Sequence, residues 1–149
     1  MIDINLHQYK DQLKLKKEGK TTWIFDVIRK KYLVLQPEEL VRQLLVHHLV
    51  DIGYPIEKIQ VEKGLDINGL RRRFDIVVYD KHFFPYLLIE CKSHTVSISQ
   101  DTFDQIAHYN IQLRAPYLLV TNGVQTYSCS LNFDSKKIEH LTEVPQPEN

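Results

Sequence analysis

The chain has 149 residues, of which 43% are hydrophobic and 26% are charged, and its 19 Lys and Arg balance its 19 Asp and Glu. This length and composition are typical of a single globular domain with a sizeable core. The zero net charge argues against a dedicated DNA-binding domain, which is usually basic. No apolar run approaches a membrane span and no signal peptide is recognisable, so we expect no membrane contact.

The first 36 residues predict a small β-structure that precedes the main domain. Residues 11–17 and 21–26 flank a turn that contains Gly19, which favours a hairpin. Residues 32–35 form a further candidate strand. We therefore divide the chain into an N-terminal hairpin extension (1–36), a core (37–143) and a loose tail (144–149) that contains two prolines.

A helix is predicted to begin at Pro37, because proline is tolerated in the first turn. Apolar residues follow at helical spacing, and Gly53 is placed to end the helix. Glu38 and Glu39 both lie in the first turn, where carboxylates suit the helix dipole. The helical phase places Glu39 farther from the apolar stripe and aims Glu38 toward the sheet, although both carboxylates remain candidates.

Two strands that each carry charged residues, 73–79 and 86–92, are the most informative part of the chain. A short loop that ends at Pro85 joins them. If they pair as an antiparallel hairpin, opposite residues have numbers that sum to about 165, which places Asp75 opposite Glu90. Because side chains alternate along a strand, Asp75, Glu90 and Lys92 share one face. The other face is predicted to carry five apolar side chains: Phe74, Ile76, Val78, Leu87 and Ile89.

The remaining elements predict a mixed sheet with helices against it. We expect a strand at residues 59–63, a loop at 64–69, a helix at 101–114, a buried strand at 117–121, a turn at 122–123, a strand at 125–131 and an edge strand at 136–141. Cys91 and Cys129 both fall in expected strands and are interpreted as reduced thiols, which favours a cytoplasmic location. The expected fold class is α/β.

Two carboxylates beside an ammonium group indicate a metal site. Neighbouring carboxylates repel each other, and a hard cation such as Mg²⁺, for which Mn²⁺ can substitute, relieves that repulsion. The backbone carbonyl of Cys91 would add a ligand to Asp75 and Glu90, and Lys92 would orient a water or hold a phosphate. The implied reaction is metal-assisted hydrolysis of a phosphodiester. The simpler interpretation is that Glu-x-Lys only marks the solvated face of a hairpin.

The spacing Asp75…Glu90-x-Lys92 resembles that of the PD-(D/E)XK nuclease superfamily. More closely, the chain is similar to the N-terminal nuclease domain of type I restriction enzyme R subunits over roughly 85 residues. The motifs that carry this resemblance are Pro37-Glu38-Glu39…Val41-Arg42-Gln43, Gly53-Tyr54-Pro55, Arg73…Asp75-Ile76-Val77-Val78, Ile89-Glu90-Cys91-Lys92, Gln105…Tyr109-Asn110 and Thr121-Asn122-Gly123.

The resemblance implies a restriction-endonuclease-like fold and a Mg²⁺-dependent endonuclease that acts on DNA. It implies that Glu38 completes the acidic cluster and that Gln105 assists catalysis, while Tyr109 contacts nucleic acid. Arg72 and Arg73 lie beside the expected site and would bind phosphate. A packing role for Gln105 and Tyr109, which are one helical turn apart, is the alternative.

The chain has no Gly-x-x-x-x-Gly-Lys-Ser/Thr phosphate loop, so we expect no ATP motor in it. We therefore expect a nuclease module that works with other subunits of a restriction-type complex, and a homodimer is compatible with the sequence. The alternatives are a catalytically inactive nucleic-acid-binding or assembly module with the same fold, and a nuclease that acts on RNA.

Overall fold

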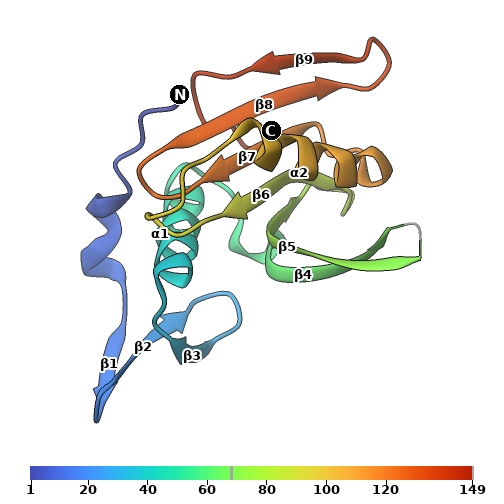
Figure 1. Ribbon diagram of the computed structural model, residues 1–149. Helices are drawn as coiled ribbons and strands as arrows, with labels where there is room; N and C mark the ends of the chain where they lie inside the picture. The colour runs from blue at the N-terminus through green and yellow to red at the C-terminus, as the bar shows by residue number, and fades with distance from the viewer. Residues whose placement is uncertain (68, 149) are drawn as a thin grey trace.

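The protein, described here from a computed structural model covering residues 1–67 and 69–148, consists of two β-sheets and two α-helices (Figure 1). Asn68, in the loop expected at 64–69, and Asn149, at the end of the tail, lie outside the described residues. A three-stranded antiparallel sheet comes first along the chain, and a six-stranded mixed sheet follows. The α/β class and the N-terminal hairpin expected from the sequence are confirmed.

The N-terminal part contains a short helix and three strands. The 3₁₀ helix η1 (Leu6–Gln12) precedes β1 (Leu15–Glu18), β2 (Thr21–Asp26) and β3 (Lys31–Val34). Gly19, at φ +61°, forms the turn between β1 and β2, a backbone conformation that glycine adopts without steric cost. The third strand pairs with β2, so the expected hairpin is part of a three-stranded sheet.

The large sheet has the strand order β4-β5-β6-β7-β8-β9. Its strands are β4 (Ile59–Ile67), β5 (Leu70–Tyr79), β6 (Pro85–Cys91), β7 (Tyr117–Thr121), β8 (Thr126–Asn132) and β9 (Lys137–His140). Among the described strands, only β6 and β7 pair in parallel, because α2 (Gln100–Leu113) connects them as a crossover. β9 forms an edge of the sheet, as the sequence predicts. β4 extends past the expected residue 63 and occupies most of the segment expected to be a loop.

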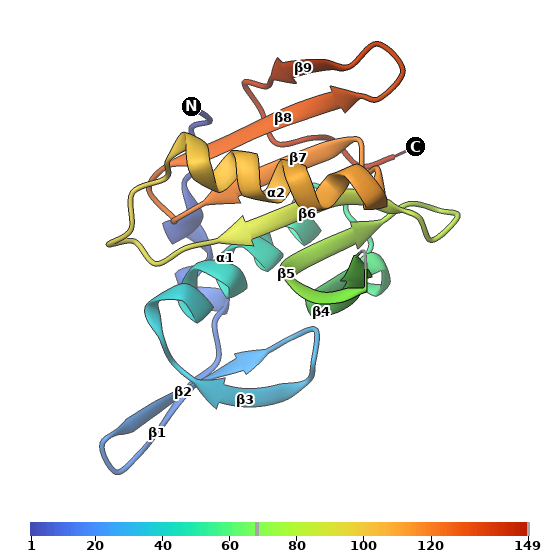
Figure 2. The ribbon, with the colours of Figure 1, turned by 45° about the vertical axis from the view of Figure 1, so that its right-hand side comes forward.

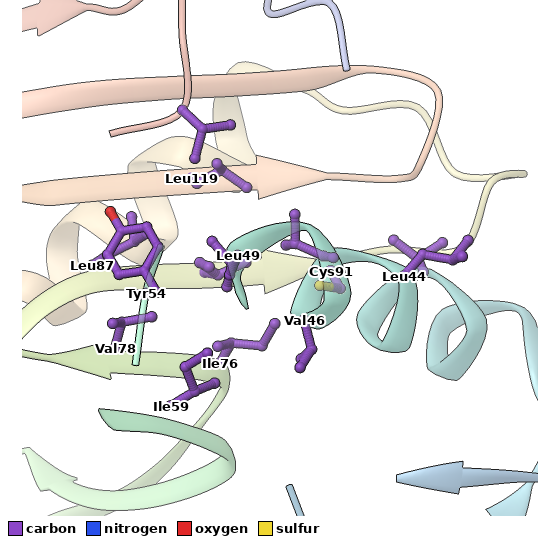
Figure 3. Close-up of a cluster of buried hydrophobic side chains, with 14 of the residues drawn as sticks. Leu44, Val46, Leu49, Tyr54, Ile59, Ile76, Val78, Leu87, Cys91 and Leu119 are labelled. Atoms are coloured by element: carbon purple, nitrogen blue, oxygen red, sulfur yellow. The ribbon is translucent and has the colours of Figure 1, made fainter. Parts of the chain in front are cut away.

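The two helices cover opposite faces of this sheet (Figures 1 and 2). α1 (Pro37–Asp51) packs on the face that carries Ile76, Val78, Leu87 and Ile89, and the short helix η2 (Ile56–Lys58) leads from it into β4. Figure 3 shows this apolar layer, in which Leu49 and Leu119 are fully buried. α2 packs on the other face through a second cluster that includes Val77, Leu88, Ile106 and Leu118. The sheet is therefore apolar on both faces, which is typical of a sheet covered on both sides.

Cys91 and Cys129 are both free and buried. Across residues 1–67 and 69–148, no helix has the length and apolar character needed to cross a membrane.

The tail expected to be loose is instead packed: Val144 is buried, and the hydroxyl groups of Tyr54 and Tyr86 donate hydrogen bonds to the carbonyls of Pro145 and Gln146. The composition of the tail predicted a loose segment, because contacts with residues far away in the sequence cannot be seen in composition.

Candidate functional site

The pairing of β5 with β6 brings the two charged strands into the expected register. Ile76 lies opposite Ile89 and Val78 opposite Leu87, so the numbers of paired residues sum to 165 as predicted. Continued by one residue, the same register places Asp75 opposite Glu90. The charge of Glu90 is close enough to raise the pKa of Asp75, so the two carboxylates lie near each other.

Asp75 lies where the main-chain pairing of the two strands stops. The last pair on this side is Ile76 with Ile89. Beyond it, the Asp75 carboxylate accepts the backbone N–H of Cys91 at 2.7 Å, so a side chain takes the place of a main-chain acceptor. Because the N–H and C=O of one strand residue point toward the same neighbouring strand, the carbonyl of Cys91 also faces this gap.

Phe74 corrects one detail of the predicted alternation. It was expected on the face of Ile76 and Val78, but it packs with Val77 on the α2 side. The alternation is interrupted at this level of the sheet, where Glu62 of β4 has φ +47° and Val61–Ile76 and Lys63–Phe74 are the adjacent pairs. A left-handed residue distorts the strand locally, but the two pairs keep the same register, so neither strand carries an extra residue here.

Burial and a neighbouring acid make the Asp75 carboxylate unusually difficult to ionise. Burial, and then the charge of Glu90, raise the pKa of Asp75 to about 7, although its hydrogen bond with Cys91 and the charge of Arg42 act in the opposite direction. A carboxylate placed at such a cost is typical of a functional site, because a structural role alone would favour a neutral side chain.

Lys92 is held between its own strand and the acidic pair. Its backbone N–H donates to the carbonyl of Thr121 at 2.8 Å, which extends the pairing of β6 with β7. Its ammonium group donates to the Glu90 carboxylate at 3.1 Å. Burial lowers the pKa of Lys92, but the charges of Glu90, Asp75 and Glu38 outweigh burial and raise it. Lys92 is therefore a protonated cation at neutral pH.

The first turn of α1 brings Glu38 toward the same charges. Burial and the charge of Asp75 raise the pKa of Glu38, and the charges of Arg42 and Lys92 lower it. The expected helical phase was wrong in one respect: Glu39 is the buried carboxylate, at 7% exposure, and Glu38 is exposed. Glu39 is occupied by Arg42, Gln43 and Arg29, whereas the charge of Asp75 acts on Glu38, so Glu38 is the candidate helix carboxylate.

The ion network around Glu39 contains two residues that the sequence analysis did not select. The buried guanidinium of Arg42 lies 2.6 Å from Glu39 and 2.8 Å from Glu62, and its charge acts on Asp75. The sequence signal was present: a charged residue within the apolar stripe of a helix requires partners, and Glu39 lies three residues before it. Glu62 stands in β4 beside Asp75 in β5, and the sequence does not reveal its left-handed backbone conformation, at φ +47°.

On the α2 side, the site opens into a hollow of about 280 Å³. Glu90 lines it from β6, as does Lys92, the residue that follows the strand; Gln105 and Tyr109 line it from α2, and Arg72 lines it from β5. The side-chain amide of Gln105 donates to the Tyr109 hydroxyl at 3.3 Å, so its described partner is Tyr109 and not Lys92. The Arg72 guanidinium lies 4.9 Å from the centre of the Tyr109 ring, a cation–π contact.

Arg73 lies at the rim of the same hollow, with its guanidinium 3.8 Å from the Glu62 carboxylate. Its side chain is 70% exposed, so this ion pair is weak and the guanidinium is available to a ligand. The structure therefore gathers all the residues selected from the sequence, Glu38, Asp75, Glu90, Cys91, Lys92, Gln105, Arg72, Arg73 and Tyr109, around one end of β5 and β6. What each of them does stays a prediction.

The oxygen donors of this site meet part of what a divalent cation needs. Over residues 1–67 and 69–148, no group of three or more His, Cys, Asp and Glu side chains is arranged to hold a metal ion. Two adjacent carboxylates and the Cys91 carbonyl are present. Mg²⁺ suits such a set, since it keeps several waters and commonly takes one or two carboxylates together with substrate phosphate. The residues therefore fit Mg²⁺ bound partly by water and substrate, and do not form an all-protein cage.

Comparisons with known proteins agree with the fold. The family model described as type I restriction enzyme R protein N terminus matches residues 37–145. A solved fragment assigned as the HsdR subunit of a type I restriction enzyme from Vibrio vulnificus YJ016 superposes with a TM-score of 0.58 at 16% sequence identity. The match covers 75% of this chain and 24% of that chain, so this chain corresponds to about a quarter of the matched fragment. No curated protein sequence matches the chain.

Proposed function

Since the chain belongs to the family of type I restriction enzyme R protein N termini, we propose that it is a Mg²⁺-dependent endonuclease module that hydrolyses DNA phosphodiester bonds. We assign its site to the PD-(D/E)XK type. The observation that carries the proposal is the Asp75–Glu90 pair, in which burial and mutual repulsion raise the pKa of Asp75 to about 7 beside a lysine that lies 3.1 Å from Glu90. The relation to restriction enzymes gives this geometry its biological context.

In this proposal, Asp75, Glu90 and the Cys91 carbonyl hold the cation. When bound, Mg²⁺ would lower the pKa of a water and stabilise negative charge on the phosphate. Lys92, kept protonated by its acidic neighbours, would hold a phosphate oxygen and orient the attacking water as a point charge. The raised pKa of Glu38 suits it to accept a proton from that water.

The hollow on the α2 side would receive the DNA backbone. Arg72 and Arg73 would contact phosphates there, and Tyr109 would stack on the strand or donate to a phosphate. Gln105 would fix the Tyr109 hydroxyl through their hydrogen bond or contact a phosphate itself. We further propose that the chain acts with other subunits of a restriction-type complex in the cytoplasm, where its two free cysteines stay reduced.

A second candidate function is a nucleic-acid-binding or assembly module that has the fold without catalysis. The zero net charge and the lack of a group of three metal-binding side chains within the described residues favour it. Metal binding separates the two candidates, because only the nuclease needs Asp75 and Glu90 as ligands.

The test is calorimetry with Mn²⁺, followed by cleavage assays on plasmid, linear duplex, single-stranded DNA and RNA with and without Mg²⁺. Wild type is expected to bind Mn²⁺ and Asp75→Ala to lose that binding. Lys92→Ala is expected to keep the metal affinity and to lose at least about 100-fold in cleavage rate. Lys81→Ala, which removes an exposed lysine in the loop between β5 and β6, is the matched control.

Equal Mn²⁺ binding by wild type and Asp75→Ala would contradict the nuclease assignment. Loss of metal affinity in Lys92→Ala would contradict the role assigned to the lysine. Cleavage of RNA but not DNA would support the assigned metal site and would show that the substrate is RNA.

A further inference from the structure

The outer face of the N-terminal sheet collects lysines and aromatic rings. In β1 and β2, Lys16 lies directly opposite Trp23. Phe25 follows Trp23 by two residues, so it shares that face, and it pairs with Tyr32 of β3. Lys14 lies beside Phe25, whose backbone N–H donates to the Lys14 carbonyl. The five side chains therefore form one surface, which we term the aromatic–lysine face.

The contacts within this face are between cations and rings. The Lys16 ammonium lies 4.3 Å from the centre of the Tyr32 ring, and the Lys14 ammonium lies 5.4 Å from that of Phe25. The Phe25 and Tyr32 rings meet edge to face at 5.2 Å. Positive charge held over an aromatic surface is suited to a ligand that has both negative charge and flat rings.

The sheet is attached to the protein by its opposite face. Ile24 and Asp26, which alternate with Trp23 and Phe25 along β2, are completely buried. Of the described residues that pack in or against the two hydrophobic clusters of the large sheet, none belongs to the aromatic–lysine face. Lys14, Lys16 and Tyr32 are exposed, whereas Trp23 and Phe25 are half-buried. The face is therefore open to a partner.

Although the net charge of the whole chain is zero, positive and negative residues are unevenly distributed along it. Residues 1–36 contain eight Lys and Arg and four Asp and Glu, whereas residues 37–149 contain 11 Lys and Arg and 15 Asp and Glu. The family model begins at residue 37, so the basic part lies outside the matched region. The positive charge of the chain is thus concentrated on the N-terminal extension, where it attracts a polyanion.

The sheet is fixed close to the candidate site. Arg29, in the turn after β2, lies 2.8 Å from Glu62 and 3.6 Å from Glu39. β3 leads directly into the first turn of α1, as Figure 2 shows. The N-terminal sheet is therefore held beside the first turn of α1, which also carries Glu38.

We propose that the aromatic–lysine face binds single-stranded DNA. Bases stack on Tyr32 and Trp23, and Lys14 and Lys16 turn from the rings to the phosphates. Unpaired bases are required, because a flat aromatic platform offers π-surface to any exposed base, whereas a duplex keeps its bases stacked on one another. The choice of DNA over RNA rests on the function proposed above. The proposal that the surface binds a single strand does not depend on that function.

Trp23 provides a direct readout, because it is the only tryptophan of the chain. The full chain is titrated in EDTA with oligo-thymidylate of roughly 16 nucleotides, the upper range for one small binding domain. Tryptophan fluorescence is expected to be quenched, and the affinity to fall steeply with salt. Lys16→Ala and Tyr32→Ala are each expected to weaken binding about fivefold to tenfold. Lys17→Ala is the matched control: it removes an exposed lysine from the same strand but the opposite face.

Several results would overturn the proposal. These are the absence of quenching, equal weakening by Lys17→Ala and Lys16→Ala, equal quenching by a duplex of the same length, and tighter binding of oligo-uridylate. A thermal melt of each variant confirms that it is folded. Because EDTA removes the metal, a failed nuclease assignment leaves this result unchanged.

Discussion

The position of Asp75 costs folding free energy at neutral pH. In an unfolded chain its carboxyl group would ionise near its ordinary pKa of 3.8, whereas burial and Glu90 raise the pKa to about 7 in the folded protein. The folded state therefore prefers the protonated carboxyl group. Stability from this group is fully present below about pH 4, falls as the pH rises from 4 to 7, and is lost above that range.

Asp75→Asn is therefore expected to stabilise the protein without metal at pH 8, by about 2 kcal/mol. The amide oxygen can still accept the Cys91 N–H, and no buried charge remains. The measurement is urea unfolding at pH 8 and pH 5, and the gain is expected to shrink at the lower pH. Asp134→Asn, which changes an exposed carboxylate, is the control with no expected gain. A loss of stability at pH 8 would contradict this account of Asp75.

The first turn of α1 carries two adjacent carboxylates, Glu38 and Glu39, which have different surroundings. Glu39 accepts hydrogen bonds from Arg42 at 2.6 Å and from Gln43 at 2.9 Å, and Arg29 reaches it from the N-terminal sheet. Glu38 is exposed and is influenced by the charges of Asp75 and Lys92. Helix α1 therefore joins the N-terminal sheet to the large sheet through Glu39, and it faces the site with Glu38.

Glu38→Gln and Glu39→Gln are expected to affect different properties. Glu39→Gln removes a charge from between buried guanidinium groups and should lower the free energy of unfolding by about 2 kcal/mol. Glu38→Gln should leave stability within about 0.5 kcal/mol of wild type. It should reduce the cleavage rate at least about tenfold, because a proton acceptor is lost. Thermal melts and initial cleavage rates measure the two effects, and the reverse assignment of the two effects would exclude Glu38 from the site.

Elements defined by local signals were predictable from the sequence. The loop before Pro85 and the alternating pattern around it gave the register that places Asp75 opposite Glu90, and the helix that begins at Pro37 was expected. The orientation of Phe74 was not predictable, because the alternation is interrupted beside Glu62, a residue of a different strand with φ +47°. The burial of Glu39 was missed for a similar reason: its partners Arg29 and Arg42 come from two elements, and a helical wheel includes only one of them.

At the scale of the whole molecule, the end of the chain fastens α1 to the loop between β5 and β6. The Tyr54 hydroxyl, just after α1, donates to the Pro145 carbonyl, and Tyr86 at the start of β6 donates to Gln146 at 2.7 Å. The Glu148 carboxylate accepts the backbone N–H of Lys81 at 3.0 Å. Val144 adds a buried apolar side chain to the cluster under α1. The tail thus closes the core at the end of the sheet opposite the candidate site.

Removal of residues 144–149 is therefore expected to lower the free energy of unfolding by about 2–4 kcal/mol, from the lost burial of Val144 and from a buried Tyr54 hydroxyl left without its acceptor. Glu148→Gln, which alters only the exposed contact with Lys81, should cost less than about 0.5 kcal/mol. Urea unfolding compares the three proteins. Because Asp75, Glu90 and Lys92 lie at the other end of their strands, Mn²⁺ affinity at a temperature where the truncated chain is folded should match that of wild type. A truncated chain as stable as the full one would show that the tail contacts do not hold the core closed.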